Sequence, residues 1–155
     1  MCIIIDTNTF SSIFDSKSAE HIEFRPVLNW IKNGKGKIVY GGTKYRNELR
    51  KAQKYLGIFN ELKKARKIVE IPNEQVDSEQ IRIEDLITHR DFDDPHLIAI
   101  VSASRCKLIC TKDKRAHPFI KETSLYPESG MRPKIYSSSI NSDLLCDLNI
   151  AGCCK

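Results

Sequence analysis

The stretch Cys2-Ile3-Ile4-Ile5-Asp6-Thr7-Asn8 decides the fold of this chain. Its four apolar residues, three of them β-branched, are typical of a strand buried on both faces of a parallel sheet. The strand ends at a carboxylate, and the polar residues that follow it are of the kind that begin a helix. Similar short apolar runs at residues 37–40, 67–71, 107–111 and 134–136 predict four more strands.

Helical patterns separate these runs. They are expected at residues 7–14, 22–31, 43–62 (one long helix capped by Thr43), 78–88, 97–104, 114–121 and 137–148. Strands that alternate with helices over short connections predict an α/β fold, a three-layer α/β/α sandwich with a mostly parallel, about five-stranded sheet. We expect residues 1–136 to form one domain and residues 137–155 to be a helical extension packed on it.

The composition of the 155 residues is that of a soluble globular protein. No apolar run is long enough to span a membrane, and the N-terminal residues enter a strand without a secretory signal pattern. The six cysteines contain no CxxC pair, so we expect reduced thiols in a cytoplasmic protein. A zinc site formed by Cys146, Cys153 and Cys154 is an alternative to a tail of unliganded cysteines.

The positive net charge of +5 hides two oppositely charged segments. Residues 43–67 contain nine Lys or Arg against two Glu, and residues 70–94 contain nine Asp or Glu against two Arg. A basic helix beside an acidic cleft would let a phosphate backbone approach while cations fill the cleft. The alternative is that both segments are solvated helix faces.

Four carboxylates stand at junctions between strands and helices: Asp6, Glu48, Asp94 and Asp113. Parallel strands end at the same edge of a sheet, so these side chains should converge in one crevice. Several carboxylates repel one another there unless a hard divalent cation neutralises them. Capping is the alternative for Asp6 and Asp94, and Asp94-Pro95 in particular is a typical helix start.

Other polar residues accompany these acids. Asn8 and Thr111 are candidates for supporting roles, with a local turn and a strand end as their alternatives. His96 and His117 lie within plausible reach of the crevice, where an imidazole would favour a transition metal over Mg²⁺. Because a lone histidine is more often a surface or core residue, neither is included in the predicted site.

Four motifs together resemble those of the PIN-domain ribonucleases, a family that includes the VapC-like toxins of toxin–antitoxin pairs. They are Ile3-Ile4-Ile5-Asp6-Thr7-Asn8, Lys44-Tyr45-Arg46-Asn47-Glu48-Leu49, Asp94-Pro95-His96-Leu97-Ile98-Ala99 and Cys110-Thr111-Lys112-Asp113. The resemblance implies an acidic pocket that binds Mg²⁺ or Mn²⁺ and cleaves single-stranded RNA. Its catalytic quartet would be Asp6, Glu48, Asp94 and Asp113, with Asp6, Asp94 and Asp113 as metal ligands and Asn8 and Thr111 in support.

The expected partners follow from this reading. Lys44, Arg46, Lys112, Lys114 and Arg115 would hold the RNA backbone without reading its sequence. A toxin would also bind a small antitoxin that fills the acidic cleft, and it could form a homodimer.

Three other functions compete. A catalytically inactive PIN-like module that binds RNA or protein is the main alternative. An aspartate phosphatase needs a second Asp where Asn8 stands, and a signalling receiver domain needs an acidic pair where Asp6 stands alone.

Overall fold

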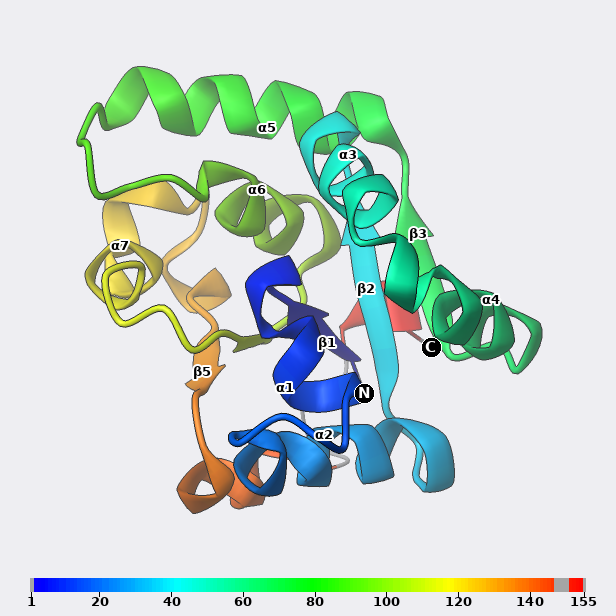
Figure 1. Cartoon of the computed structure of the whole chain (residues 1–155). Helices are drawn as coiled ribbons and strands as arrows, with labels where there is room; N and C mark the ends of the chain where they lie inside the picture. The colour runs from blue at the N-terminus through cyan, green and yellow to red at the C-terminus, as the bar shows by residue number, and fades with distance from the viewer. Residues whose placement is uncertain (1, 147–150, 155) are drawn as a thin grey trace.

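A computed structural model describes residues 2–146 and 151–154 and contains one five-stranded sheet (Figure 1). The strands are β1 (Cys2–Ile5), β2 (Lys37–Gly41), β3 (Ile68–Ile71), β4 (Leu108–Cys110) and β5 (Lys134–Tyr136). Their order is β3-β2-β1-β4-β5, and every neighbouring pair is parallel. The expected α/β class and five-stranded parallel sheet are therefore confirmed.

Helices connect all of these strands. The α-helices are α1 (Phe10–Phe14), α2 (His21–Asn33), α3 (Thr43–Lys51), α4 (Leu56–Lys64), α5 (Asn73–Leu86), α6 (Pro95–Ser104) and α7 (His117–Lys121). Short 3₁₀ turns occupy η1 (Thr7–Thr9), η2 (Gln53–Tyr55), η3 (Thr123–Leu125), η4 (Ser129–Met131), η5 (Ser139–Leu144) and η6 (Gly152–Cys154). No helix in the described parts of the chain is both long enough and apolar enough to cross a membrane.

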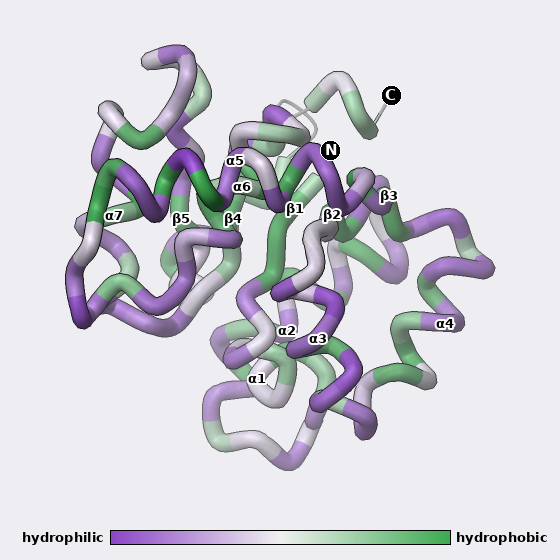
Figure 2. The backbone as a smooth tube through the Cα atoms, turned by 90° about the horizontal axis from the view of Figure 1, so that it is seen from above, coloured by the Kyte–Doolittle hydropathy of each residue, from purple (hydrophilic) through white to green (hydrophobic). Residues whose placement is uncertain are grey.

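The helices form two layers around the sheet. The chain runs from β1 outward to β3 and then returns to β4 and β5 on the other side of β1. Because such crossovers are right-handed, the reversal moves the later helices to the opposite face. Figure 2 shows α5 and α6 on one side of the strands and α1, α2 and α3 on the other. The reversal places a topological switch point between β1 and β4, where open α/β sheets form their binding crevices.

The hydrophobic core lies on both faces of β1. Ile3, Ile4 and Ile5 are completely buried, as the β-branched run predicts. On one face they meet α6, in which nine of ten residues are buried, from Pro95 to Ser104. A helix that is apolar all round is a core helix, and α6 packs between the sheet and α5 (Figure 1). This helix carries Asp94 and His96 at its N-terminus.

The predicted long helix over residues 43–62 is wrong in two respects. It breaks after Lys51, and the 3₁₀ turn η2 redirects the chain into α4. The redirected helix packs Phe59 against Phe10, with ring centroids 5.2 Å apart, and against Tyr40 at 6.1 Å. Aromatic burial in this cluster stabilises the bend. Helix α3 also begins at Thr43 with Gly42 at the N-cap, so Thr43 does not cap its own helix.

The chain after β5 returns to α2. The hydroxyl and backbone N–H of Ser139 both donate to Glu23 Oε2, at 2.6 and 2.9 Å, and the Tyr136 hydroxyl donates to the Glu23 carbonyl at 2.8 Å. The segment Ser139–Leu144 is a 3₁₀ helix rather than the start of an α-helix. The rest of the predicted last helix, including Leu148, lies outside the described residues.

Candidate metal centre at the carboxyl ends of the strands

Asp6 lies at the switch point between β1 and β4. Its backbone N–H donates to the Cys110 carbonyl at 2.9 Å, which extends the pairing of the two strands. Its side chain is buried, and Oδ2 accepts a 2.7 Å hydrogen bond from the Thr111 hydroxyl while Oδ1 accepts from the Asn8 backbone N–H at 3.0 Å. Burial raises the pKa of Asp6 despite the two hydrogen bonds, which lower it. Asp6 also caps η1 through Asn8, so its capping and site roles coexist.

Glu48 reaches the same edge from α3. Its Oε2 accepts a 2.8 Å hydrogen bond from the Thr7 hydroxyl and lies 3.3 Å from Nε2 of His96. Burial opposes the charged form, but His96, Thr7 and Lys44 together hold the pKa of Glu48 below its usual value. Glu48 is therefore a carboxylate at neutral pH.

Asp94 occupies the N-cap position of α6 with Pro95 at the first helical position, as the sequence predicts. Its side chain makes no capping hydrogen bond, and only 13% of it is exposed. Burial, followed by the negative charge of Asp6, raises the pKa of Asp94. Capping therefore does not explain the carboxylate, which remains free to bind a ligand.

His96 is the site residue that the sequence analysis left out. Its side chain is buried, with Nε2 3.3 Å from Glu48 and Nδ1 3.9 Å from Asp94. Neither ring nitrogen makes a well-oriented hydrogen bond. A buried imidazole without such partners is costly unless something else satisfies it. One feature of the sequence could have identified His96 as a site residue: it directly follows Asp94-Pro95 at the start of an apolar helix.

These three residues form a compact donor group. One carboxylate oxygen each from Glu48 and Asp94 and one ring nitrogen of His96 all lie within 4.8 Å of one another. Two carboxylates and a neutral imidazole form a donor set that suits a divalent transition metal such as Mn²⁺ better than Mg²⁺. The unpartnered ring nitrogens of His96 and the uncapped carboxylate of Asp94 fit such an ion. Asp6 adjoins the group, since its charge acts on Asp94.

Asp113 is not brought into this group by its side chain. Its carboxylate accepts from Arg115 at 3.1 Å (Nε to Oδ1) and 2.9 Å (Nη2 to Oδ2). The Arg115 guanidinium lowers the pKa of Asp113. The backbone of Asp113 is nevertheless connected to the site, because its N–H donates to the Thr111 hydroxyl at 3.1 Å and that hydroxyl donates to Asp6.

Asn8 and Thr111 differ in what they contribute. Thr111 is completely buried and joins Asp6 to the backbone of Asp113, which is the supporting position predicted for it. Asn8 is exposed and contacts Asp6 through its backbone N–H alone among the hydrogen bonds of the described residues.

Three of the five basic residues expected to hold RNA form ion pairs with acidic side chains. Arg46 pairs with Glu70 at 2.6 Å, Lys112 with Glu20 at 2.7 Å, and Arg115 with Asp113. Lys114 is exposed. Lys44 is nearest the donor group: its charge acts on Glu48 and Asp94, and its Nζ donates to the Asp93 carbonyl at 2.5 Å.

A groove leads away from Glu48 between α3 and α5. It has a volume of about 430 Å³, and Lys44 and Lys51 line it together with Asn47 and Asp77. Glu48 and Lys51 also border a second hollow beside Thr7 and Asn8. Lys51 was not among the predicted RNA-binding residues. Its position one turn after Asn47 on α3 places it along the groove.

Comparison with known proteins gives no family to which the chain can be assigned. No family model, curated protein or solved structure matches the chain. The resemblance to PIN-domain ribonucleases therefore rests on the four sequence motifs alone.

Proposed function

We propose that this protein is a divalent-metal-dependent endoribonuclease that hydrolyses phosphodiester bonds in single-stranded RNA. One observation supports this most: Glu48, Asp94 and the buried imidazole of His96, whose nitrogens make no well-oriented hydrogen bond, gather within 4.8 Å beside the buried carboxylate of Asp6. They do so at the switch point of a parallel sheet. The motif resemblance supplies the substrate class.

Each site residue would have a distinct role in binding the ion or in positioning its ligands. Glu48, Asp94 and His96 would hold Mn²⁺ or Mg²⁺, with Asp6 as a further ligand on the β1 side. Such an ion supplies charge neutralisation at the phosphate and a lowered pKa for the attacking water. Thr111 and Asn8 fix the Asp6 carboxylate by their hydrogen bonds, and Thr7 fixes that of Glu48. A rigidly held donor set loses little free energy on binding its ligand.

The α3–α5 groove is the proposed path for the RNA strand. Lys44 and Lys51 lie on its wall and would contact phosphates on either side of Glu48. Contacts of this kind position the strand without reading its bases. Tyr45 cannot stack on a base, because it is completely buried and its hydroxyl donates to the Ile5 carbonyl at 2.6 Å.

The test is cleavage of single-stranded RNA by the wild type in Mn²⁺ or Mg²⁺, compared with Asp94→Asn and Glu48→Gln. We expect each variant to lose at least about 100-fold in rate, because each removes a ligand of the ion that stabilises transition-state charge. Arg105→Gln is the surface control, since Arg105 pairs with Glu128 outside the donor group. Wild-type activity in the two site variants, or activity that survives chelation, would refute the proposal.

A catalytically inactive PIN-like module is the second candidate. The pairing of Asp113 with Arg115 favours it, because a guanidinium then occupies both oxygens of the fourth acid of the motif series, which lies outside the group of Glu48, Asp94 and His96. Titration calorimetry with Mn²⁺ separates the two candidates. The nuclease should bind the ion through Asp94 and His96, whereas the inactive module should bind it weakly or not at all.

The proposal also includes a cellular location and protein partners. The reduced state of the six thiols supports a cytoplasmic location. If the protein is a toxin, its antitoxin would insert a basic side chain among the carboxylates of Glu48 and Asp94. Co-expression with the product of the neighbouring gene tests both expected partners. The mass of the purified complex shows whether that product is bound and whether the protein is a homodimer.

A further inference from the structure

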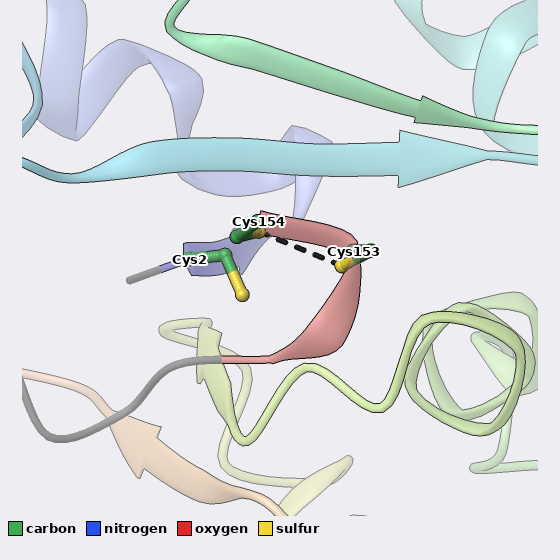
Figure 3. A group of neighbouring side chains, drawn as sticks. All are labelled: Cys2, Cys153 and Cys154. Atoms are coloured by element: carbon green, nitrogen blue, oxygen red, sulfur yellow. Dashed lines mark hydrogen bonds between the residues drawn. The ribbon is translucent and has the colours of Figure 1, made fainter.

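A second group of side chains lies at the opposite edge of the sheet. Cys2 begins β1, and Cys106 stands two residues before the neighbouring strand β4. The 3₁₀ turn Gly152–Cys154 returns to this edge and brings Cys153 and Cys154 to Cys2. Figure 3 shows the turn lying across the start of β1. Three segments far apart in the sequence thus contribute four thiols.

The sulfur atoms are close enough to share one ion. The Sγ atoms of Cys2, Cys153 and Cys154 all lie within 4.8 Å of one another, and those of Cys153 and Cys154 are 3.5 Å apart (Figure 3). Cys106 neighbours Cys2, and its thiol donates to the Leu108 carbonyl at 3.6 Å. Tetrahedral Zn²⁺ with Zn–S bonds of about 2.3 Å holds its sulfurs about 3.8 Å apart. The Cys153–Cys154 separation of 3.5 Å is close to that value, and the pairs with Cys2 lie within 4.8 Å.

Simple core packing explains this arrangement less well. Cys2, Cys106 and Cys154 are buried, and a lone buried cysteine would behave as a small apolar side chain. Here, however, the sulfurs of two consecutive cysteines lie 3.5 Å apart, and both lie within 4.8 Å of a third (Figure 3). Cys110 provides the contrast, because it is buried in β4, where burial and the charge of Asp6 rather than another thiol raise its pKa.

We propose that Cys2, Cys153 and Cys154 form a thiolate site for Zn²⁺, and that the Cys106 thiol leaves the Leu108 carbonyl to become the fourth ligand. Each coordinating thiol releases its proton to solvent as the Zn–S bond forms. The ion would fasten the C-terminal turn to the first strand. This ligand set replaces Cys146, which the sequence hypothesis included, with Cys2. The site is separate from the donor group of Glu48, Asp94 and His96 and does not depend on the proposed nuclease activity.

The test is Co²⁺ titration of the reduced, metal-free protein under anaerobic conditions. We expect about one equivalent of Co²⁺ to give sulfur-to-cobalt charge-transfer absorption and the visible bands of tetrahedral Co²⁺, both lost when Zn²⁺ is added. Cys2→Ser and Cys154→Ser should each weaken Co²⁺ binding at least about 10-fold. Cys153→Ser, at the least buried of the three, is the further variant if either fails to fold.

Two control variants show whether the sulfur-to-cobalt bands come from this group of cysteines. Cys146→Ser changes a cysteine outside the group and should keep the sulfur-to-cobalt bands. Asp94→Asn removes a ligand at the other edge and should also keep them, which separates this site from the proposed catalytic one. Absence of these bands from the reduced wild type, or their survival in both Cys2→Ser and Cys154→Ser, would overturn the proposal.

Discussion

At the scale of single residues, the negative charge of Asp94 would serve metal binding but lowers the stability of the metal-free protein. Burial and the Asp6 charge raise its pKa in the folded state, so its negative charge costs stability at neutral pH. The stability that Asp94 contributes is fully present below its unfolded-state pKa and is lost as the pH rises through its folded-state pKa. Asp94→Asn should therefore raise the unfolding free energy of the metal-free protein at pH 7 by about 1 kcal/mol, measured by urea unfolding in chelator.

The same variant has a pH signature. Its advantage should disappear as the pH falls below roughly 3.9, the unfolded-state pKa of Asp, because the wild-type carboxyl is then neutral as well. Asp113→Asn is the matched control, because the pKa of Asp113 is shifted in the opposite direction from that of Asp94. Its carboxylate is paired with Arg115 and has a lowered pKa, so the variant should gain nothing at pH 7 and lose less than about 1 kcal/mol. Equal stabilisation by both variants would contradict this account.

Arg115 decides whether Asp113 can join the metal site. Its guanidinium occupies both oxygens of Asp113. If Asp113 is a ligand, Arg115→Ala should free it and tighten Mn²⁺ binding about threefold or more, measured by calorimetry. Removing any nearby positive charge also favours a cation, so Lys114→Ala, which removes the adjacent exposed charge, is the control. Equal effects of the two variants would exclude Asp113 as a ligand.

The sequence predicts the positions of Asp6, Glu48 and Asp94 because parallel strands end at one edge and those residues follow strands or begin helices. It does not predict the side-chain direction of Asp113, since a rotamer that favours Arg115 depends on the local loop. His96 was missed for a different reason. Its neighbours Leu97 and Ile98 make it look like a core residue, and only the fold shows that Glu48 and Asp94 face it.

At the scale of elements, the start of α3 determines where Glu48 points. Gly42 has a φ of +85°, and a Cβ added there would lie 2.6 Å from Cγ1 of Val76. Asp77 of α5 then caps α3 by accepting from the Thr43 N–H at 2.8 Å and its hydroxyl at 2.6 Å. The helix is thus held by a residue from α5, which sequence patterns within α3 could not reveal.

Gly42→Ala should accordingly destabilise the protein by about 1–3 kcal/mol, the usual cost of a strained backbone position, and should weaken Mn²⁺ binding through Glu48. Gly57→Ala is its counterpart, because Gly57 lies inside α4 with nothing within 4 Å of the added Cβ. Gly57→Ala should raise the free energy of unfolding by about 0.5–1 kcal/mol. Urea unfolding measures both, and the expectation fails if the two changes have the same sign.

The elements themselves follow from sequence more reliably than their ends. Short β-branched runs gave all five strands within a residue or two, because buried parallel strands need apolar residues on both faces. The break after Lys51 was not predicted, since helical periodicity continues through it while the aromatic contacts of Phe59 with Phe10 and Tyr40 favour the bend. Those contacts are long-range and leave no local pattern.

At the scale of the whole molecule, the two proposed metal sites lie at opposite edges of one sheet. Residues Cys2 to Ile5 separate them along β1, which corresponds to about 13 Å at 3.3 Å per residue. Sites this far apart and without shared contacts should contribute to stability independently. Mn²⁺ at 100 times its dissociation constant should stabilise the wild type by about 2.7 kcal/mol, and Zn²⁺ should add its own increment.

A double-mutant cycle tests this independence. In the presence of both ions, Asp94→Asn should abolish the Mn²⁺ increment alone, and Cys154→Ser the Zn²⁺ increment alone. The double variant should lose the sum of the two within about 0.5 kcal/mol, measured by urea unfolding at fixed free-ion concentrations. A larger coupling free energy would mean that fastening the C-terminal turn to β1 also orders Asp6 at the far end of that strand, because β1 is the element that the two sites share.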